Sequence, residues 1–265
     1  MLAAAHGHYL AALPLYAAAV LVKPQALMLA PLGLAMLVLE VVESQEKGKT
    51  LLRLLGGLGL GIGLWLALSL PFIWSLPPAL LEDYQALPQW LRPLCWLLGQ
   101  YGGVMNTYRY ITVNACNLYE LMGLNWIQMS QVPSVTLFAM AMLAAAYAFG
   151  LFLYIKAKDR GKVFLCGAVI LALVYAFAPM MHERYMYPAL AFLLLAYVFD
   201  RDLRLLGAFT LLSFSQFMNV ALVLQSEYLA TSQQTLNHLI SLINVLTSVF
   251  LAWTGWEMCV SGHMI

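Results

Sequence analysis

The first candidate site is a run of four polar residues in an otherwise apolar part of the chain: His182, Glu183, Arg184 and Tyr185. Ionisable residues beside a membrane span cost free energy, so they usually mark a site or a pathway and are usually paired. The run therefore predicts a polar site at one end of a span. The alternative is that Glu183 and Arg184 only solvate an interfacial turn, while the tyrosines form an aromatic belt.

The second candidate is Lys23, the one Lys, Arg, Asp or Glu in residues 9–39, which is followed by Pro24 and Gln25. A cation with an amide neighbour in such a setting favours an anionic partner. The alternative is that the lysine side chain extends to the membrane interface and binds nothing. Because proline removes a backbone donor and restricts the residue before it, a helix boundary is predicted at Lys23.

The third candidate is the segment 75–133, which is rich in aromatic and amide side chains, among them Asn114, Asn117, Asn125 and Trp126. Aromatic rings with amides form surfaces that stack on sugar rings and hydrogen-bond their hydroxyl groups. Interfacial belts use the same aromatic residues, so a structural role stays open. Isolated Asn219 and Asn244 are expected to hydrogen-bond between helices and are given no functional role.

The composition defines the solvent in which these candidates must be positioned. Hydrophobic residues make up 63% of the 265 residues and charged residues 9%, whereas about 25% is charged in a typical soluble domain. The net charge of +1 offers no basic surface, so no nucleic-acid partner is expected. The four cysteines contain no CxxC pair, and neither a metal site nor a cofactor is predicted. For Cys95 and Cys116, separate thiols are favoured over a disulfide.

Apolar segments of about 20 residues, the length that crosses a bilayer as a helix, recur along the chain. They predict an all-α fold, a polytopic transmembrane helical bundle of about six to eight spans in a single membrane domain, residues 1–265. Residues 9–42 are predicted to form a broken helix or hairpin, and 75–133 a long outer loop with interfacial helices. The predicted spans are 51–74, 134–155, 163–181, 186–199, 205–224 and 237–258. Glycines 57, 59, 61 and 63 predict close helix packing rather than a nucleotide site.

Basic residues gather in three connections, 43–53, 156–162 and 200–204. Alternating spans place all three on one side, which the positive-inside rule identifies as the cytoplasm. The segment 75–133 and the links 180–187 and 225–235 then face outward, and Lys23 lies towards the same side. The charges at the ends of the spans thus divide into cytoplasmic anchors and outer candidates.

Three stretches together resemble a known group of enzymes. They are residues 21–27 (LVKPQAL), residues 113–126 (VNACNLY followed by GLNW) and residues 181–188 (MHERYMYP). In type, order and spacing they are similar to the C-terminal part of bacterial multi-pass glycosyltransferases of the GT-C superfamily, the mannosyltransferase-like kind. The resemblance covers roughly residues 10 to 225.

Members of that superfamily transfer a sugar from a polyprenyl-phosphate carrier to an acceptor on the outer face of the membrane. The resemblance thus implies a multi-pass protein of the bacterial cytoplasmic membrane whose partners are a polyprenyl-phosphate-linked sugar, a glycan or lipid acceptor and membrane lipids. Mannose is the sugar it suggests. Lys23 and Arg184 would supply cations for the phosphate, and His182 and Glu183 would orient phosphate or sugar hydroxyls. The implied substrate-binding residues are Lys23, Gln25, Asn114, Asn117, Asn125, Trp126, His182, Glu183, Arg184 and Tyr185.

The resemblance also exposes a departure from the superfamily. Its general base is an acidic residue in the first outer loop, after the first span, and nothing here resembles it. We therefore expect the chain to lack an N-terminal half, and whether it is active alone stays open. Inversion needs a carboxylate that takes the acceptor's proton, and the strong outer candidates are Glu82, Asp83, Glu120 and Glu183. None is assigned as the base, so the catalytic residues stay unknown.

Two other functions remain open. A transporter or lipid flippase would explain the broken first segment, because broken helices are a device of transporters. A non-catalytic membrane scaffold is the third possibility and would suit a truncated enzyme. The polar clusters fall at the predicted outer rim rather than at the midplane, and no internal repeat is evident.

Overall fold

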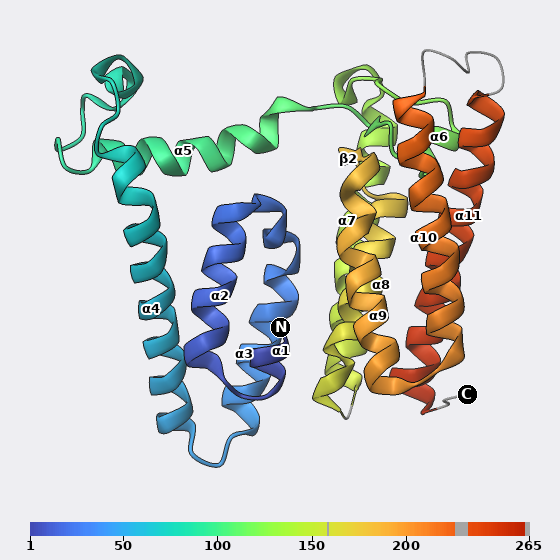
Figure 1. Cartoon of the computed structure of the whole chain (residues 1–265), viewed down its shortest axis with the longest axis horizontal. Helices are drawn as coiled ribbons and strands as arrows, with labels where there is room; N and C mark the ends of the chain where they lie inside the picture. Colours follow the sequence, from blue (N-terminus) through green and yellow to red (C-terminus); the bar gives the residue numbers. More distant parts are fainter. Residues whose placement is uncertain (158, 226–232, 263–265) are drawn as a thin grey trace. The chain divides into compact units, whose positions relative to one another are not determined.

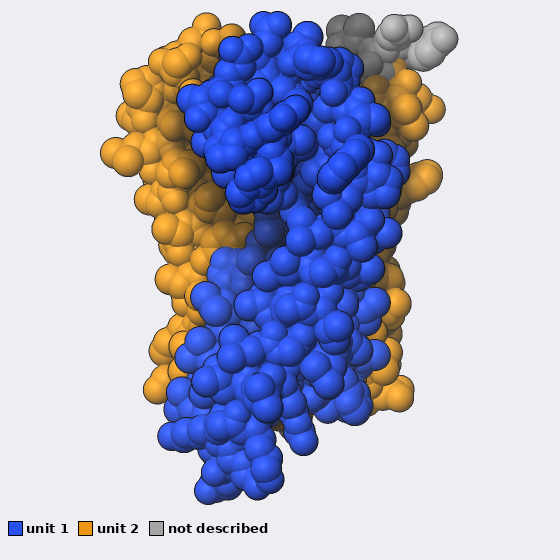
Figure 2. Space-filling model, turned by 90° about the vertical axis from the view of Figure 1, so that its left-hand side faces the viewer, with its two compact units in different colours: residues 1–108 blue, residues 109–265 orange. Residues whose placement is uncertain are grey.

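The computed structural model describes residues 1–157, 159–225 and 233–262, without the side chains of residues 104–107, and it is built almost entirely of helices (Figure 1). The predicted all-α fold is confirmed. Two compact units, Met1–Tyr108 and Arg109–Ile265, make up the chain (Figure 2). Their boundary falls inside the 75–133 segment, so the predicted single membrane domain has an internal division. Each unit is described by itself below.

Within the described ranges, six helices are long and apolar enough to cross a bilayer. The chain is therefore a multi-pass membrane protein. The assignment of the Lys/Arg-rich connections to the cytoplasm stays a prediction. Residue 158 and most of the predicted link 225–235 lie outside the described residues. The six helices are Pro24–Glu43, Lys47–Ile73, Pro133–Lys156, Arg160–Phe177, Leu203–Leu224 and Gln233–Ser261.

Unit 1 has α2 and α4 at its centre. Its elements are α1 (Leu2–Ala5), α2 (Tyr9–Val22), the 3-10 helix η1 (Pro24–Leu29), α3 (Ala30–Glu43), α4 (Lys47–Ile73), η2 (Pro78–Tyr84) and α5 (Arg92–Thr107). Between α2 and η1 the backbone of Lys23 is extended, at φ −152° and ψ 111°. The predicted break thus coincides with the end of α2; η1 packs against α2, and α3 packs against α4.

Close packing in unit 1 depends on two of the four glycines of α4 for which close helix packing was predicted, Gly57 and Gly61. A Cβ atom on Gly57 would lie 2.6 Å from the backbone oxygen of Tyr9, and one on Gly61 would lie 3.2 Å from that of Leu13. Cβ atoms on Gly59 and Gly63 would meet open space. The two buried glycines therefore let the α4 and α2 backbones approach, as small residues do between membrane helices.

Unit 2 is a helical bundle around α8. Residues 163–176 of α8 are all buried, and the helix packs against α7, α9 and α11. A helix that is apolar on all sides belongs in the core of its bundle. The elements are β1 (Thr112–Val113), α6 (Leu118–Leu121), η3 (Met129–Gln131), α7 (Pro133–Lys156), η4 (Arg160–Lys162), α8 (Val163–Phe177), β2 (Met181–His182), η5 (Glu183–Met186), α9 (Tyr187–Asp200), α10 (Leu203–Leu224), α11 (Gln233–Trp256) and the π-helical η6 (Glu257–Ser261).

Two predicted spans differ from the helices of unit 2. The span predicted over 163–181 ends at Phe177, because Ala178 precedes Pro179 and is extended, and residues 181 and 182 form a strand. The span predicted over 186–199 corresponds to α9, which has 14 residues. At about 1.5 Å per residue, this helix is shorter than the hydrocarbon core of a bilayer.

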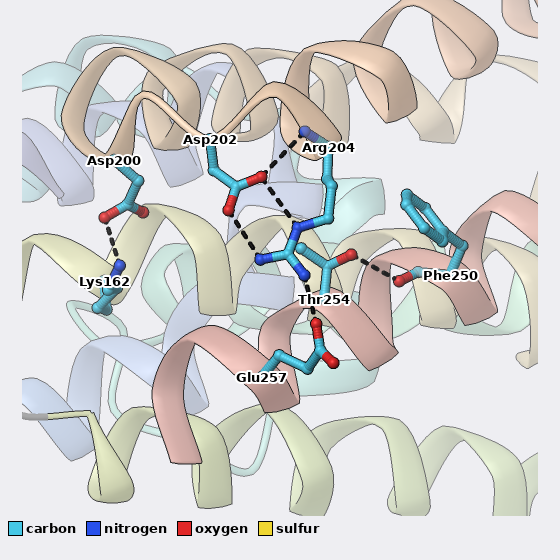
Figure 3. Close-up of polar contacts among 7 residues, drawn as sticks. All are labelled: Lys162, Asp200, Asp202, Arg204, Phe250, Thr254 and Glu257. Atoms are coloured by element: carbon cyan, nitrogen blue, oxygen red, sulfur yellow. Dashed lines mark hydrogen bonds and ion pairs between the residues drawn. The ribbon is translucent and has the colours of Figure 1, made fainter. Parts of the chain in front are cut away.

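Ion pairs tie the helices together where η4 precedes α8 (Figure 3). Lys162 Nζ lies 2.5 Å from Asp200 Oδ1, and both side chains are buried. Arg204 donates to Asp202 at 2.8 Å and also pairs with Glu257. The first pair joins η4 to α9 and the second joins α10 to η6, so Lys162 and Arg204, two basic residues of the predicted anchors, are paired within the protein.

Candidate functional site

The candidate site lies at the other end of α8, where residues 109–132 cover the bundle (Figure 1). Strand β1 pairs in parallel with β2, so that Thr112 faces Met181 and Val113 faces His182. Asn114 forms a further bridge with His182. This pairing brings together two of the three sequence motifs, although about seventy residues separate them along the chain.

An amide cluster fixes the backbone of the 113–126 motif. The backbone N–H of Asn114 donates to Asn125 Oδ1 at 2.8 Å, and Asn125 Nδ2 donates back to Asn114 Oδ1 at 3.3 Å. The indole N–H of Trp126 donates to the same Asn114 oxygen at 2.9 Å. The three side chains, each predicted to bind substrate, therefore form one hydrogen-bonded group.

Two residues of this cluster adopt the left-handed backbone region, Asn114 at φ 55° and Trp126 at φ 59°. Asparagine tolerates that region, but for a bulky residue such as tryptophan it is an outlier. Strained backbone persists only where its surroundings hold it, and it gathers at functional sites. Here the constraint presents an indole that is 47% exposed and packs edge-on against Tyr110, with ring centroids 5.2 Å apart.

The 181–188 motif contributes a buried imidazole, that of His182. His182 is 6% exposed, and its ring centroid lies 5.0 Å from that of Tyr185. Burial and the nearby Arg184 lower the pKa of His182, against a smaller opposing effect of Glu183. The imidazole is therefore neutral at pH 7, with one ring nitrogen as a donor and the other as an acceptor.

Glu183 and Arg184 pair with each other. Arg184 Nη1 lies 2.7 Å from Glu183 Oε1, and the arginine side chain is 51% exposed. Its guanidinium carbon lies 5.9 Å from the centroid of the Tyr185 ring. Gln216, on α10, donates to the backbone oxygen of Glu183 at 2.6 Å. The turn is thus fixed by a side chain of α10, while the Arg184 guanidinium stays accessible.

Asn117 has a positioning role in the structure. Its Oδ1 accepts from the backbone N–H groups of Tyr119 and Glu120 and so caps α6, and its Nδ2 donates to the backbone oxygen of Tyr175. The side chain is fully buried. Because its oxygen and nitrogen are both used inside the protein, Asn117, predicted to bind substrate, is better explained as an anchor of the loop.

Asn219 was expected to hydrogen-bond between helices, and its bond with Tyr175 of α8 agrees with that, but its contacts with residues 114 and 116 were not predicted. It lies on α10 with 1% of its surface exposed. Its Nδ2 donates to the backbone oxygen of Asn114 at 2.8 Å, while its Oδ1 accepts from Cys116 N at 3.2 Å and from the Tyr175 hydroxyl at 2.8 Å. Asn244 acts similarly on α11, donating to the backbone oxygen of Cys116 at 2.8 Å. An asparagine within an apolar span was the only available signal.

Glu120 is the buried carboxyl of this end of unit 2. Its side chain accepts from Asn237 Nδ2 at 3.1 Å through Oε1, whereas Oε2 has no hydrogen-bond partner among the described residues. Burial raises the pKa of Glu120, and the Asn237 hydrogen bond and the charge of His238 oppose that rise. The group is thus a carboxyl whose ionisation the fold disfavours.

The remaining two predicted residues, Lys23 and Gln25, belong to unit 1. Lys23 is exposed where α2 ends, and Gln25 lies in η1. The structure therefore brings together eight of the ten predicted residues within unit 2 and leaves these two outside that group.

In the part of the chain that the structure describes, no three His, Cys, Asp or Glu side chains are placed to hold a metal ion. Cys95, Cys116, Cys166 and Cys259 are free thiols. Comparison of the chain with models of known families, with curated proteins and with solved structures found no match. Functional assignment therefore depends on the chemistry of the cluster and on the motifs themselves.

Proposed function

We propose that this chain is a membrane glycosyltransferase of the GT-C kind, or part of one, which transfers a sugar from a polyprenyl-phosphate donor to a glycan or lipid acceptor. The observation that carries the proposal is the pairing of β1 with β2. It joins the amide cluster of Asn114, Asn125 and Trp126 to the His182 turn at one end of a membrane bundle. Two of the three motifs behind the resemblance thus form one surface.

The chemistry of that surface suits a sugar joined to a phosphate. The exposed face of Trp126 can stack on a pyranose ring, and amide groups beside it can orient hydroxyls. Arg184 can donate paired N–H groups to phosphate oxygens, which leave with the electron pair of the cleaved glycosidic bond. The neutral imidazole of His182 can donate to a phosphate oxygen or accept from a hydroxyl. We assign no general base.

Transfer of radiolabelled mannose from polyprenyl-phosphate mannose, in membranes that contain the full chain, tests the proposal. We expect His182→Ala and Trp126→Ala to lower transfer about 100-fold, the typical loss when one group that stabilises a transition state is removed. The matched control is Met122→Ala, which changes an exposed side chain of the same loop and should leave transfer unchanged.

Wild-type transfer by both site variants would overturn the site. Absence of transfer by the wild-type chain with mannose, glucose or galactose donors would overturn the proposal for this chain acting alone. Movement of the donor lipid between the two leaflets of a vesicle membrane, without sugar transfer, would instead support the flippase alternative. The extended backbone between α2 and η1 at Lys23 is the feature that favours this alternative.

A further inference from the structure

We propose that unit 1 contains a binding site for a phosphate-bearing membrane lipid, in a cavity of about 870 Å³ between α4, η2 and the start of α5. The volume is within the range of small-molecule sites in proteins. The proposal concerns unit 1 alone and does not depend on sugar transfer.

One wall of the cavity belongs to a membrane-spanning helix. Leu66, Leu70 and Ile73 occupy the last two turns of α4, the Lys47–Ile73 candidate span. Leu81 from η2 and Leu94 from α5 line the opposite parts. The apolar wall of the cavity is therefore part of a candidate membrane span. Such a wall suits a hydrocarbon chain better than a water-soluble ligand.

The frame that holds the cavity open comes from contacts between α4, η2 and α5. Gly99 on α5 lies so close to the hydroxyl of Tyr84 that a Cβ there would clash. Trp65 on α4 and Tyr101 on α5 have ring centroids 6.4 Å apart. These contacts fix the turn between η2 and α5 against the end of α4, so the cavity is preformed.

The mouth of the cavity is aromatic and polar. Trp74 and Trp90 line it and are largely exposed, and such amphipathic rings gather at the level of lipid headgroups. Gln85 and Gln89 add amides beside them. The apolar wall and the interfacial mouth together match the two parts of a lipid molecule.

Arg92 supplies the charge at this mouth. Its Nε donates to the backbone oxygen of Leu87 at 2.9 Å and its Nη2 to that of Gln85 at 2.9 Å. Both contacts orient the guanidinium, and its Nη1 group has no partner among the described residues. No acidic side chain lines the cavity. A positioned cation without a carboxylate favours an anionic ligand, and guanidinium N–H groups bind phosphate well.

The test measures lipid retention by native mass spectrometry of the purified full chain in detergent. The probes are dioleoyl phosphatidylglycerol, dioleoylglycerol, which has the same chains without phosphate, and inorganic phosphate. We expect saturable binding of phosphatidylglycerol at least tenfold tighter than that of dioleoylglycerol, because hydrogen bonds to a charged group are worth about that much. Inorganic phosphate at the same concentration should not compete.

Three variants locate the site. Arg92→Gln should reduce phosphatidylglycerol binding about tenfold, to the level of dioleoylglycerol, by removing the charged donor. Leu70→Trp should weaken both lipids by filling the apolar wall, and it leaves Arg92 in place if loss of the two carbonyl contacts unfolds the first variant. The control is Arg53→Gln, which removes an exposed cation near the other end of α4 and should change neither affinity.

Wild-type retention of phosphatidylglycerol by Leu70→Trp would overturn the proposal, as would an unchanged preference for phosphatidylglycerol in folded Arg92→Gln. Competition by inorganic phosphate would indicate an anion site without lipid recognition and would equally overturn it.

Discussion

The substitution Asn219→Leu tests whether the bundle holds the loop of the candidate site. Leucine has a similar size but no polar group, so the variant loses three hydrogen bonds, to Asn114 O, Cys116 N and the Tyr175 hydroxyl. These three partner groups remain buried, so water cannot easily replace the lost hydrogen bonds. We expect the loop to open locally, while α7 to α11 keep their packing.

The size of the effect follows from the number of contacts. A hydrogen bond contributes about 1 kcal/mol in a soluble protein and about 0.6 kcal/mol between membrane helices. Three such bonds give a loss of about 2 to 3 kcal/mol. Since 1.4 kcal/mol is a factor of ten, the open population should rise about 30- to 140-fold.

Cys116 reports this opening. The thiol is buried, and its pKa is raised to about 12, mainly by burial and further by the nearby Glu120. A thiol reacts as its thiolate, so maleimide should modify Cys116 only in the open state, where its pKa returns to about 8.5. Peptide mass spectrometry gives the modification rate of each cysteine separately.

The expected result is a rate at Cys116 that rises about 30- to 140-fold in Asn219→Leu, with little change at the buried Cys166 and Cys259, because local opening leaves the rest of the bundle intact. The control Phe217→Leu, at an exposed position of α10, should stay within about threefold of wild type. A Cys116 rate within threefold of wild type in Asn219→Leu would refute the reasoning, and equal acceleration at all three cysteines would show global unfolding instead.

Three further predictions concern stability in detergent micelles. Lys162→Met leaves a buried carboxylate unpaired and should cost about 3 to 5 kcal/mol in equilibrium unfolding, most of which the double variant Lys162→Met/Asp200→Leu should restore. Because burial raises the pKa of Glu120 above its ordinary 4.5, the wild type should lose stability as pH rises from 4.5 through the raised pKa, and melting curves of Glu120→Gln should lack that loss. Gly57→Ala should lower the melting temperature, since its Cβ would collide with the α2 backbone, whereas Gly59→Ala should not.

The helices could be predicted because apolar runs and prolines are signals that depend only on neighbouring residues in the sequence. An apolar run of sufficient length predicts a membrane helix, and Pro24 fixes the end of α2 whatever surrounds it. The end of α8 has a local signal as well, because Ala178 is extended and precedes Pro179. Hydropathy alone misplaced this end, since the apolar run continues to Met181. The pairing of β2 with β1 was not predictable in this way, because the two strands are remote in sequence.

The candidate site was predictable only in part for a related reason. The run of polar residues from His182 is visible in the sequence because it interrupts apolar residues. The role of Asn219 is not, because a single amide in a span has many possible partners and its three are set by the tertiary fold. Likewise, no local pattern in the sequence reveals the division into two units, which assigns Lys23 and Gln25 to unit 1 and the other candidates to unit 2.

The loop of the site illustrates how irregular backbone survives at the end of a membrane bundle. Backbone groups away from water need partners inside the protein, and amides from α10 and α11 supply them to Asn114 and Cys116. With the backbone held by these amides, Arg184 can extend outward without stabilising the loop itself, whereas Trp126 also donates to Asn114. Substitution of Arg184 should therefore change ligand binding more than stability, whereas substitution of Trp126 or Asn219 should change both.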